Sequence, residues 1–192
     1  MYSRIKQLAT IITFILLAMA AAHPLHASTD PELQKLLKDA IDSDSGFEDR
    51  FDAQVWLLDM SGRLETFVPD HKTRIDMLKL IHYEARRVSI EPELVLAVIE
   101  VESRFDEYAI SISGARGLMQ IMPFWLDEIG ISDQNLFKIR TNLRMGCTIL
   151  RYYLDMEPRS LGRALARYNG SLGKTVYPNK VVNALQKNWF KQ

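Results

Sequence analysis

Residues 94–105 read LVLAVIEVESRF, an almost uninterrupted apolar run that contains two glutamates. Because each residue of a helix turns by about 100°, a helix over this run places Glu102 on the same face as Val95, Val98 and Ile99. Burial on this face disfavours the charged form of a carboxyl group, which raises its pKa and lets it hold a proton near neutral pH. Such a group is suited to general acid catalysis. An ion pair with a core arginine is the alternative interpretation.

The other glutamate of the run, Glu100, falls on the opposite side of the same helix, together with Glu93 and Ala97. An amphipathic surface helix keeps its solvated residues on such a face. We therefore expect Glu100 to be exposed and to take no part in chemistry.

The remaining sequence also has helical patterns, separated by proline, glycine, serine and asparagine residues. Helices are predicted over about residues 31–41, 49–67, 70–88, 92–105, 140–156, 161–168 and 178–190. No segment alternates as a strand would, and no internal repeat occurs. The sequence therefore predicts an all-α fold, with one compact helical domain and a short acidic helical extension before it.

Two of the predicted helices have faces that we expect to point inward. For the helix that Asp70 is placed to cap, these residues are Ile75, Leu78, Ile81 and Ala85. For the preceding helix they are Phe51, Val55, Leu58 and Leu64. Helix-like spacing of apolar residues is the basis of both predictions.

The first 27 residues resemble a secretory signal peptide, with a basic start, an apolar stretch and small residues before Ser28. The apolar stretch, residues 8–22, is shorter than the roughly 20 residues of a membrane-spanning helix. We therefore expect cleavage after Ala22 or Ala27, a periplasmic location and no membrane span after processing. An uncleaved anchor is the alternative. The expected organisation is a signal peptide at 1–27, the acidic extension at 28–72 and the main domain at 73–192.

Cysteine and histidine usage argues against disulfide and zinc sites. Cys147 is the only cysteine, so no intramolecular disulfide can form, and it shares a predicted helix face with Leu143 and Leu150. A small core residue is the expected role. Outside the first 27 residues only His71 and His82 remain, too few for a histidine-rich metal site. The sequence therefore does not predict a zinc site.

The charge of the chain balances overall but is unevenly distributed. Residues 28–72 contain 11 acids and 5 bases, whereas residues 158–192 contain seven Lys or Arg and no acid. A basic end favours an anionic polymer through electrostatic steering. A solvated helix face that balances the acidic front is the alternative. No nucleic-acid-binding motif accompanies the charge, so nucleic acid is not an expected partner.

Two further stretches have residues suited to a binding groove. In SISGARGLMQIMP, residues 111–123, Gly114 and Gly117 allow tight turns and close backbone approach, as a groove wall requires. Gln120 in the same stretch has an amide that both donates and accepts, which suits recognition of sugar hydroxyl and acetamido groups. In RYNGSLG, residues 167–173, a Tyr-Asn pair ends a predicted helix.

The order VIEVESRF, SISGARGLMQIMP and ARYNGSLG resembles the catalytic domain of the soluble lytic transglycosylases, bacterial enzymes of goose-type-lysozyme-like fold that cleave peptidoglycan. The resemblance covers about residues 73–190. It implies that Glu102 is the catalytic acid and base and that the Tyr168 hydroxyl reaches its carboxyl group. It also implies a substrate-binding groove wall made of Ser111, Gly117, Gln120, Met122, Tyr168 and Asn169.

Some positions depart from the usual family pattern. Arg167 stands where a small residue is common, and Glu107 stands where proline is common. Gly170 and Ser171 replace the more usual Ala-Gly.

Three of the motif side chains also have ordinary structural interpretations. Met119 and Met122 are suited to filling a core, and Tyr168 to packing as a core aromatic with its hydroxyl satisfied. The family pattern favours the site for Met122 and Tyr168.

The resemblance implies a reaction without water and without a metal or organic cofactor. Glu102 would protonate the oxygen between N-acetylmuramic acid and N-acetylglucosamine while the muramyl acetamido oxygen stabilises the forming cation. Ionised Glu102 would then take the proton from the muramyl C6 hydroxyl, which leaves a 1,6-anhydro ring. Peptidoglycan glycan strands are the expected partner, together with an envelope-spanning secretion or pilus assembly.

Two alternatives stay open. The first is a lysozyme-like hydrolase in which Asp106, four residues after Glu102, supplies a second carboxylate. We disfavour it because Phe105 is expected to end the helix. The second is a non-catalytic peptidoglycan-binding accessory of a secretion or pilus machine, docked through its acidic front.

Overall fold

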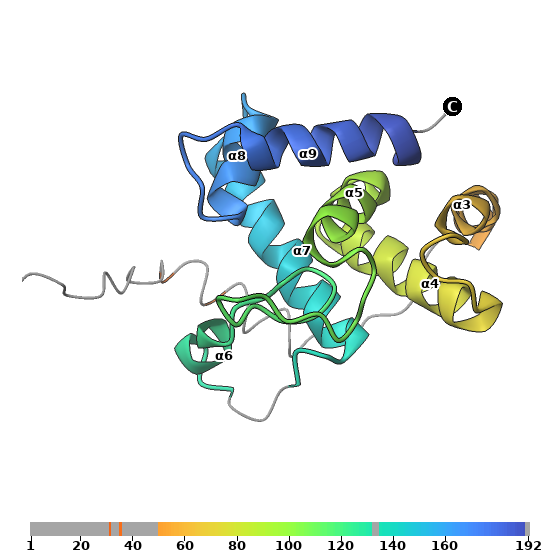
Figure 1. The fold of residues 1–192 in the computed structure, drawn as a ribbon, viewed down its shortest axis with the longest axis horizontal. Helices are drawn as coiled ribbons and strands as arrows, with labels where there is room; N and C mark the ends of the chain where they lie inside the picture. Colours follow the sequence, from red (N-terminus) through yellow and green to blue (C-terminus); the bar gives the residue numbers. More distant parts are fainter. Residues whose placement is uncertain (1–30, 32–34, 36–49, 132–134, 191–192) are drawn as a thin grey trace, which may run out of the picture.

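The computed structural model describes residues 31, 35, 50–131 and 135–190, and this part of the chain is helical (Figure 1). Its elements are α3 (Arg50–Leu64), α4 (His71–Arg87), α5 (Pro92–Ser103), α6 (Phe124–Glu128), α7 (Ile139–Met156), α8 (Leu161–Tyr168) and α9 (Val176–Ala184), then a π-helical turn, η2 (Leu185–Trp189). Among the described residues no strand forms, and Arg116 makes isolated bridges to Ile110 and Ile121. The predicted all-α fold is confirmed. The expected signal peptide and most of the helix predicted at 31–41 lie outside the described residues.

Helix α5 is enclosed by other helices. It packs against α4, α9 and η2, and Figure 1 shows it between α4 and α9. Pro92 stands at its first turn, where a missing N–H costs no hydrogen bond. Every side chain from Val95 to Ile99 is fully buried. The helix is therefore not an amphipathic surface helix.

The expectation of a solvated face on α5 is wrong. Glu93 is buried and accepts a hydrogen bond from Nε1 of Trp56 at 3.2 Å. Glu100 accepts hydrogen bonds from Nδ2 of Asn188 at 2.9 Å and from Nε1 of Trp189 at 2.7 Å. Helices from both ends of the described chain cover this face and supply N–H donors, so its carboxylates are satisfied without full solvation.

Helix α3 packs with a face that shares Leu64 with the predicted one but excludes Val55 and Leu58. Trp56, Met60 and Leu64 are buried in the hydrophobic core, whereas Val55 and Leu58 are 68% and 81% exposed. Both sets have helical spacing, so periodicity alone could not choose between them. The side chain of Phe51 lies outside the described part.

Helix α4 follows its prediction closely. The side chain of Asp70 accepts a hydrogen bond from the Thr73 N–H at 2.8 Å, as an N-cap should. Leu78, Ile81 and Ala85 are fully buried, while the fourth predicted residue, Ile75, is only partly buried.

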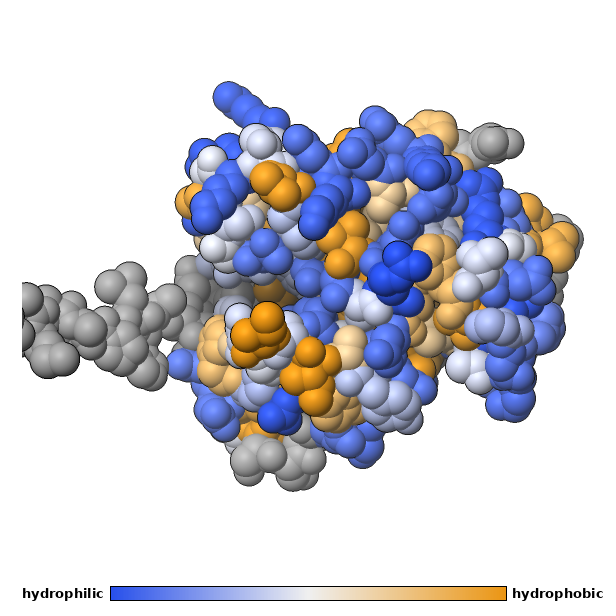
Figure 2. Space-filling view, in the orientation of Figure 1, coloured by the Kyte–Doolittle hydropathy of each residue, from blue (hydrophilic) through white to orange (hydrophobic). Residues whose placement is uncertain are grey.

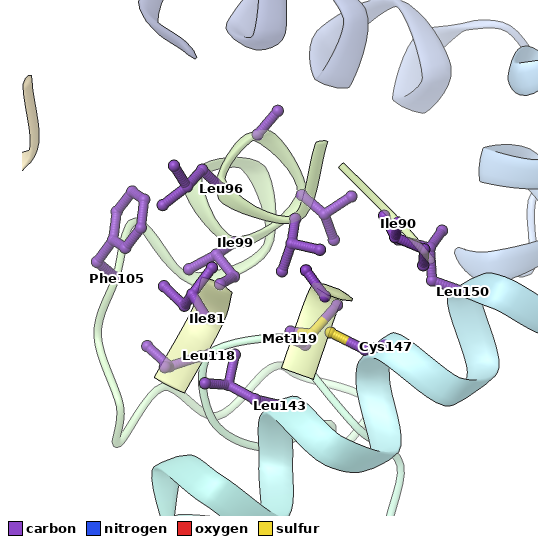
Figure 3. Packing of buried hydrophobic residues seen from close by; sticks show 14 of the residues in the cluster. Ile81, Ile90, Leu96, Ile99, Phe105, Leu118, Met119, Leu143, Cys147 and Leu150 are labelled. Carbon is purple, nitrogen blue, oxygen red and sulfur yellow. The ribbon is translucent and has the colours of Figure 1, made fainter. Parts of the chain in front are cut away.

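Helix α7 forms the other wall of the core. Figure 3 shows Leu143 and Cys147 of α7 in the same cluster as Ile81 and Ile99, with Met119 beside Cys147. Cys147 is completely buried, and burial raises the pKa of its thiol. The prediction that it is a core residue is confirmed.

A buried ion pair network also joins α7 to α4. Glu84, fully buried, accepts hydrogen bonds from Nε of Arg144 at 2.9 Å and from Nε of Arg87 at 2.7 Å. Paired in this way, the charges are compensated, and removing one partner would leave another buried without compensation. None of the helices in the described ranges is both long and apolar enough to cross a membrane.

Candidate active site

Glu102 lies in the last turn of α5, where the chain leaves the helix abruptly. Arg104 and Phe105 adopt left-handed backbone conformations with φ of 53° and 67°. The Phe105 ring is buried against Phe67 and Trp189, with ring centroids 5.2 and 5.5 Å away. These contacts hold the turn in place.

Asp106 consequently does not share a helix face with Glu102. Its carboxylate is exposed and accepts a hydrogen bond from the Tyr108 N–H at 2.9 Å. The expectation that the helix stops before Asp106 is confirmed, since α5 ends at Ser103.

The carboxyl group of Glu102 is held by two side chains. Oε1 accepts a hydrogen bond of 2.7 Å from the Tyr177 hydroxyl, and the Asn169 side chain also hydrogen-bonds to it. Burial raises the pKa of Glu102 to about 7, and the two hydrogen bonds, which favour the carboxylate, offset only part of this rise. A carboxyl group with such a pKa is populated in both forms at neutral pH, as general acid-base catalysis requires.

The tyrosine that contacts Glu102 is not the expected one. The Tyr168 hydroxyl donates to the backbone carbonyl of Met119 at 2.8 Å, and the hydroxyl on Glu102 belongs to Tyr177. Burial raises the pKa of both phenols well above their ordinary value, so both remain hydrogen-bond donors. Sequence reasoning missed Tyr177 because it lies in the first turn of α9, outside the three motifs, and reaches the site only through packing of α9 on α5.

Two polar side chains of the loop before α6 are oriented by the backbone. Nε2 of Gln120 donates to the carbonyls of Ala109 at 3.2 Å and Gly117 at 2.9 Å. Since both partners are acceptors, the amide nitrogen must face them, which leaves the Gln120 carbonyl oxygen for the groove. Oγ of Ser111 accepts from the Ala115 N–H at 3.0 Å and keeps its own proton to donate.

Gly117 has a structural role and does not form the groove wall that we expected. It is buried with φ of +73°, and a Cβ there would lie 2.5 Å from Nδ2 of Asn142 and 2.7 Å from the Leu136 carbonyl oxygen. The glycine therefore permits the loop to lie directly against α7.

Asn142 of α7 is the partner that fastens this loop, and sequence reasoning missed it. Its Oδ1 accepts from the Met119 N–H at 2.7 Å, and its Nδ2 donates to the carbonyls of Arg116 and Leu136 at 2.8 and 2.9 Å. The side chain is almost fully buried. An asparagine within a helical pattern has no local signal that distinguishes it from a solvated one.

Two cavities adjoin at Glu102. The first, of about 290 Å³, is lined by Glu102, Ser111, Ser113, Ala115, Gln120, Ile121, Met122, Trp125, Ile149, Tyr153, Tyr168 and Asn169. The second, of about 310 Å³, is lined by Val101, Glu102, Asn169, Ser171, Lys174, Val176, Tyr177 and Lys180. Figure 2 shows the surface hollowed between the region of α8 and α9 and the region of the loop and α6. The structure thus brings all the predicted site residues except Gly117 to one cavity.

Among the described residues that line these two cavities, Glu102 is the only one with a carboxyl group. Met122 lines the first cavity, whereas Met119 is fully buried in the core. The arrangement can therefore deliver and recover one proton at the junction of two cavities.

Known proteins with similar sequences are lytic transglycosylases. Over 100 residues the chain is 36% identical to "Membrane-bound lytic murein transglycosylase F" of Desulfosudis oleivorans. This alignment covers 49% of this chain and 22% of that protein. Over 137 residues the chain is 28% identical to "Membrane-bound lytic murein transglycosylase C" of Shigella sonnei. This alignment covers 61% of this chain and 38% of that protein. A 46-residue stretch is 50% identical to transglycosylase C of Actinobacillus pleuropneumoniae serotype 5b, covering 24% of this chain and 13% of that protein.

The chain spans less than two-fifths of the length of each of these relatives. The family model described as "Transglycosylase SLT domain" matches residues 79–190, which include α5, the loop before α6 and all helices up to η2. Every residue that lines the two cavities falls within this match. The chain therefore belongs to the Transglycosylase SLT domain family.

Proposed function

We propose that the protein is a lytic transglycosylase that cleaves the β-1,4 bond between N-acetylmuramic acid and N-acetylglucosamine in peptidoglycan. The observation that carries this proposal is that Glu102, with a pKa of about 7, is the single carboxyl group among the described residues that line the two cavities. Ordinary glycosidases require two carboxyl groups. With one, the substrate itself must supply the second function. The names of the relatives support the same reaction.

In the first step, protonated Glu102 donates its proton to the glycosidic oxygen, and the bond from that oxygen to the muramyl C1 breaks. The acetamido oxygen of the muramyl residue stabilises the positive charge that forms at C1. Tyr177 and Asn169 favour the carboxylate that Glu102 becomes, because both hydrogen-bond to it.

In the second step, the Glu102 carboxylate takes the proton of the muramyl C6 hydroxyl, and the oxygen of that hydroxyl forms a bond to C1. A 1,6-anhydro ring results, Glu102 is again protonated, and no water is consumed. A pKa near neutrality suits both steps, since the same group must give and then accept a proton.

The loop residues of the first cavity would bind the sugars. The carbonyl oxygen of Gln120 is available to accept hydrogen bonds from substrate groups. The Ser111 hydroxyl is available to donate a hydrogen bond to them. Met122 supplies an apolar contact surface in the same cavity, and Tyr168 and Asn169 line its α8 side.

We place this activity in the cell envelope, where its proposed substrate is found. The relatives are named membrane-bound. Export through residues 1–27 and a role in a secretion or pilus assembly stay predictions from the sequence.

Digestion of purified sacculi with the protein, followed by mass spectrometry of the released muropeptides, tests the proposal. We expect 1,6-anhydromuramyl ends from the wild type and a loss of about 10² to 10⁴ in rate for Glu102→Gln. Asp106→Asn is the matched control, because it makes the same carboxyl-to-amide change at an exposed position. It should stay within a few-fold of wild type.

Other products would contradict the proposal in distinct ways. Reducing muramyl ends together with an inactive Asp106→Asn variant would identify a two-carboxylate hydrolase. Binding to sacculi without any released product would identify the accessory protein.

A further inference from the structure

The two cavities beside Glu102 differ in charge. The cavity on the α9 side contains Lys174 and Lys180, and apart from Glu102 its described lining has no acidic residue. The described lining of the other cavity contains no lysine or arginine. A substrate that passes both cavities therefore meets positive charge on one side of Glu102 only.

Within the described part of the chain, these two lysines form no ion pair that would stabilise the fold. Arg163 and Arg167, from the same basic end of the chain, donate to the Glu157 carboxylate at 2.7 and 2.6 Å and brace the start of α8. Lys174 and Lys180 are exposed and make no ion pair with any carboxylate of the described residues. Their positive charge is available to a ligand.

Ser171 adds a second observation in the same wall. Its Oγ is shielded from solvent and has no hydrogen-bond partner in the described part of the chain. A buried polar group without a partner is costly unless a bound molecule supplies one. Ser171 is also one of the positions at which this sequence departs from the usual family pattern.

We propose that Lys174 and Lys180 bind a carboxylate of the peptidoglycan substrate next to the scissile bond. The proposal rests on the peptidoglycan substrate of the proposed function. The sugar rings of the glycan are uncharged, so its carboxylates lie on the lactyl group of a muramyl residue without a peptide, or on the stem peptide. An ammonium on a flexible four-carbon side chain can reach either without a fixed geometry.

The expected role is substrate capture. Exposed charge pairs contribute little individually, so we expect Lys174→Gln with Lys180→Gln to raise KM by about tenfold and to change kcat by less than about twofold. The effect should fade in 1 M salt, where the screening length falls to about 3 Å. Lys174→Arg with Lys180→Arg should restore the wild-type KM.

The matched control is Lys79→Gln with Lys187→Gln, which removes the same charge from exposed positions outside both cavities. Each pair of substitutions is made in the full-length protein, and thermal unfolding checks that each variant folds. Two substrates are compared: isolated glycan strands with stem peptides, and strands from which an amidase has removed them.

The two substrates identify the source of the carboxylate. A loss only on the amidase-treated strands supports the lactyl group, whose carboxylate is freed when the peptide is removed, and a loss only on peptide-bearing strands supports the stem peptide. A loss on both substrates supports binding of either carboxylate. Equal KM values for the cavity and control variants on both substrates would overturn the proposal.

Strand binding is measured in parallel in the Glu102→Gln background. This readout judges the lysines independently of turnover. If the wild type releases no anhydro product, the proposed function fails, and the binding comparison still decides whether Lys174 and Lys180 hold the strand. Equal binding by the two sets of variants would overturn the lysine proposal on its own.

Discussion

The Tyr177 hydroxyl donates a hydrogen bond of 2.7 Å to Oε1 of Glu102, and it joins residues 75 positions apart in the sequence. The bond links the first turn of α9 to the last turn of α5. It also lowers the pKa of Glu102 against the larger upward effect of burial. Tyr177 thus affects both the position and the protonation of the proposed acid.

Tyr177→Phe should lower kcat/KM at neutral pH by about ten- to a hundredfold, because a hydrogen bond to a charged or reacting group is lost. For the wild type, kcat/KM should fall above pH 7, where Glu102 loses its proton. In the variant this fall should occur at higher pH, because the pKa of Glu102 rises without the bond.

Tyr168→Phe is the control. It loses only the hydrogen bond to the Met119 carbonyl, so the fall of its kcat/KM on the alkaline side should stay at the same pH. An unmoved fall of kcat/KM in Tyr177→Phe would contradict the assigned role.

Glu102→Gln should stabilise the protein above pH 7. The pKa of Glu102 is about 7 in the folded protein and 4.5 for an unperturbed glutamate, so between these pH values the folded protein binds up to one more proton than the unfolded chain. The free energy of unfolding of the wild type therefore falls as pH rises through this window. Glutamine does not titrate. Its advantage should be absent at pH 4 and reach up to about 3 kcal/mol at pH 8.

Urea unfolding at both pH values measures this difference. Asp106→Asn is again the matched control, because it makes the same carboxyl-to-amide change at an exposed position. Equal stability of wild type and Glu102→Gln at pH 8 would mean that the Glu102 carboxylate costs the fold nothing.

Asn142→Ala should lower the free energy of unfolding by about 3 kcal/mol or more, because three backbone groups, two of them in buried hydrogen bonds, lose their partner. The loop with Gln120 loses its attachment to α7, so activity should fall as well. Urea unfolding measures the loss, with Asn179→Ala on the exposed side of α9 as control. A loss below about 1 kcal/mol would indicate that the loop is held elsewhere.

Gly117→Ala and Gly114→Ala separate backbone strain from crowding in the same loop. The two glycines have φ of +73° and +86°, but only the Cβ at 117 meets other atoms within 4 Å. Gly114→Ala should cost about 1 kcal/mol from the left-handed backbone alone. Gly117→Ala should cost clearly more, since Asn142 or the Leu136 carbonyl must move. Equal losses of stability for the two variants in thermal or urea unfolding would show that the close contact at Gly117 does not affect the free energy of unfolding.

Several features were predictable because their causes are local. Asp70 caps α4 with its own side chain, Pro92 begins α5, and α8 has the predicted bounds. Periodicity placed Leu78, Ile81 and Cys147 in the core, where the structure has them. Each of these depends on neighbours within a turn or two of helix, which the sequence presents directly.

The errors share one physical origin, which is contact between distant segments. Helix periodicity predicted a solvated Glu100, but Asn188 and Trp189, almost 90 positions later in the sequence, donate hydrogen bonds to it. Gly117 suggested a groove wall, but Asn142, which is 25 positions later in the sequence, lies against it. No local pattern reports such contacts.

The sequence by itself determined the described helices other than the short α6, the buried face that carries Glu102, and the motifs whose residues line one cavity. Only the tertiary structure decided that Tyr177 rather than Tyr168 reaches Glu102. It also decided which basic residues of residues 158–192 pair with Glu157 and which line the second cavity. Helix formation and burial periodicity depend on short-range backbone geometry. The partner of a hydrogen bond or a charge depends on how helices pack, which involves residues far apart in the chain.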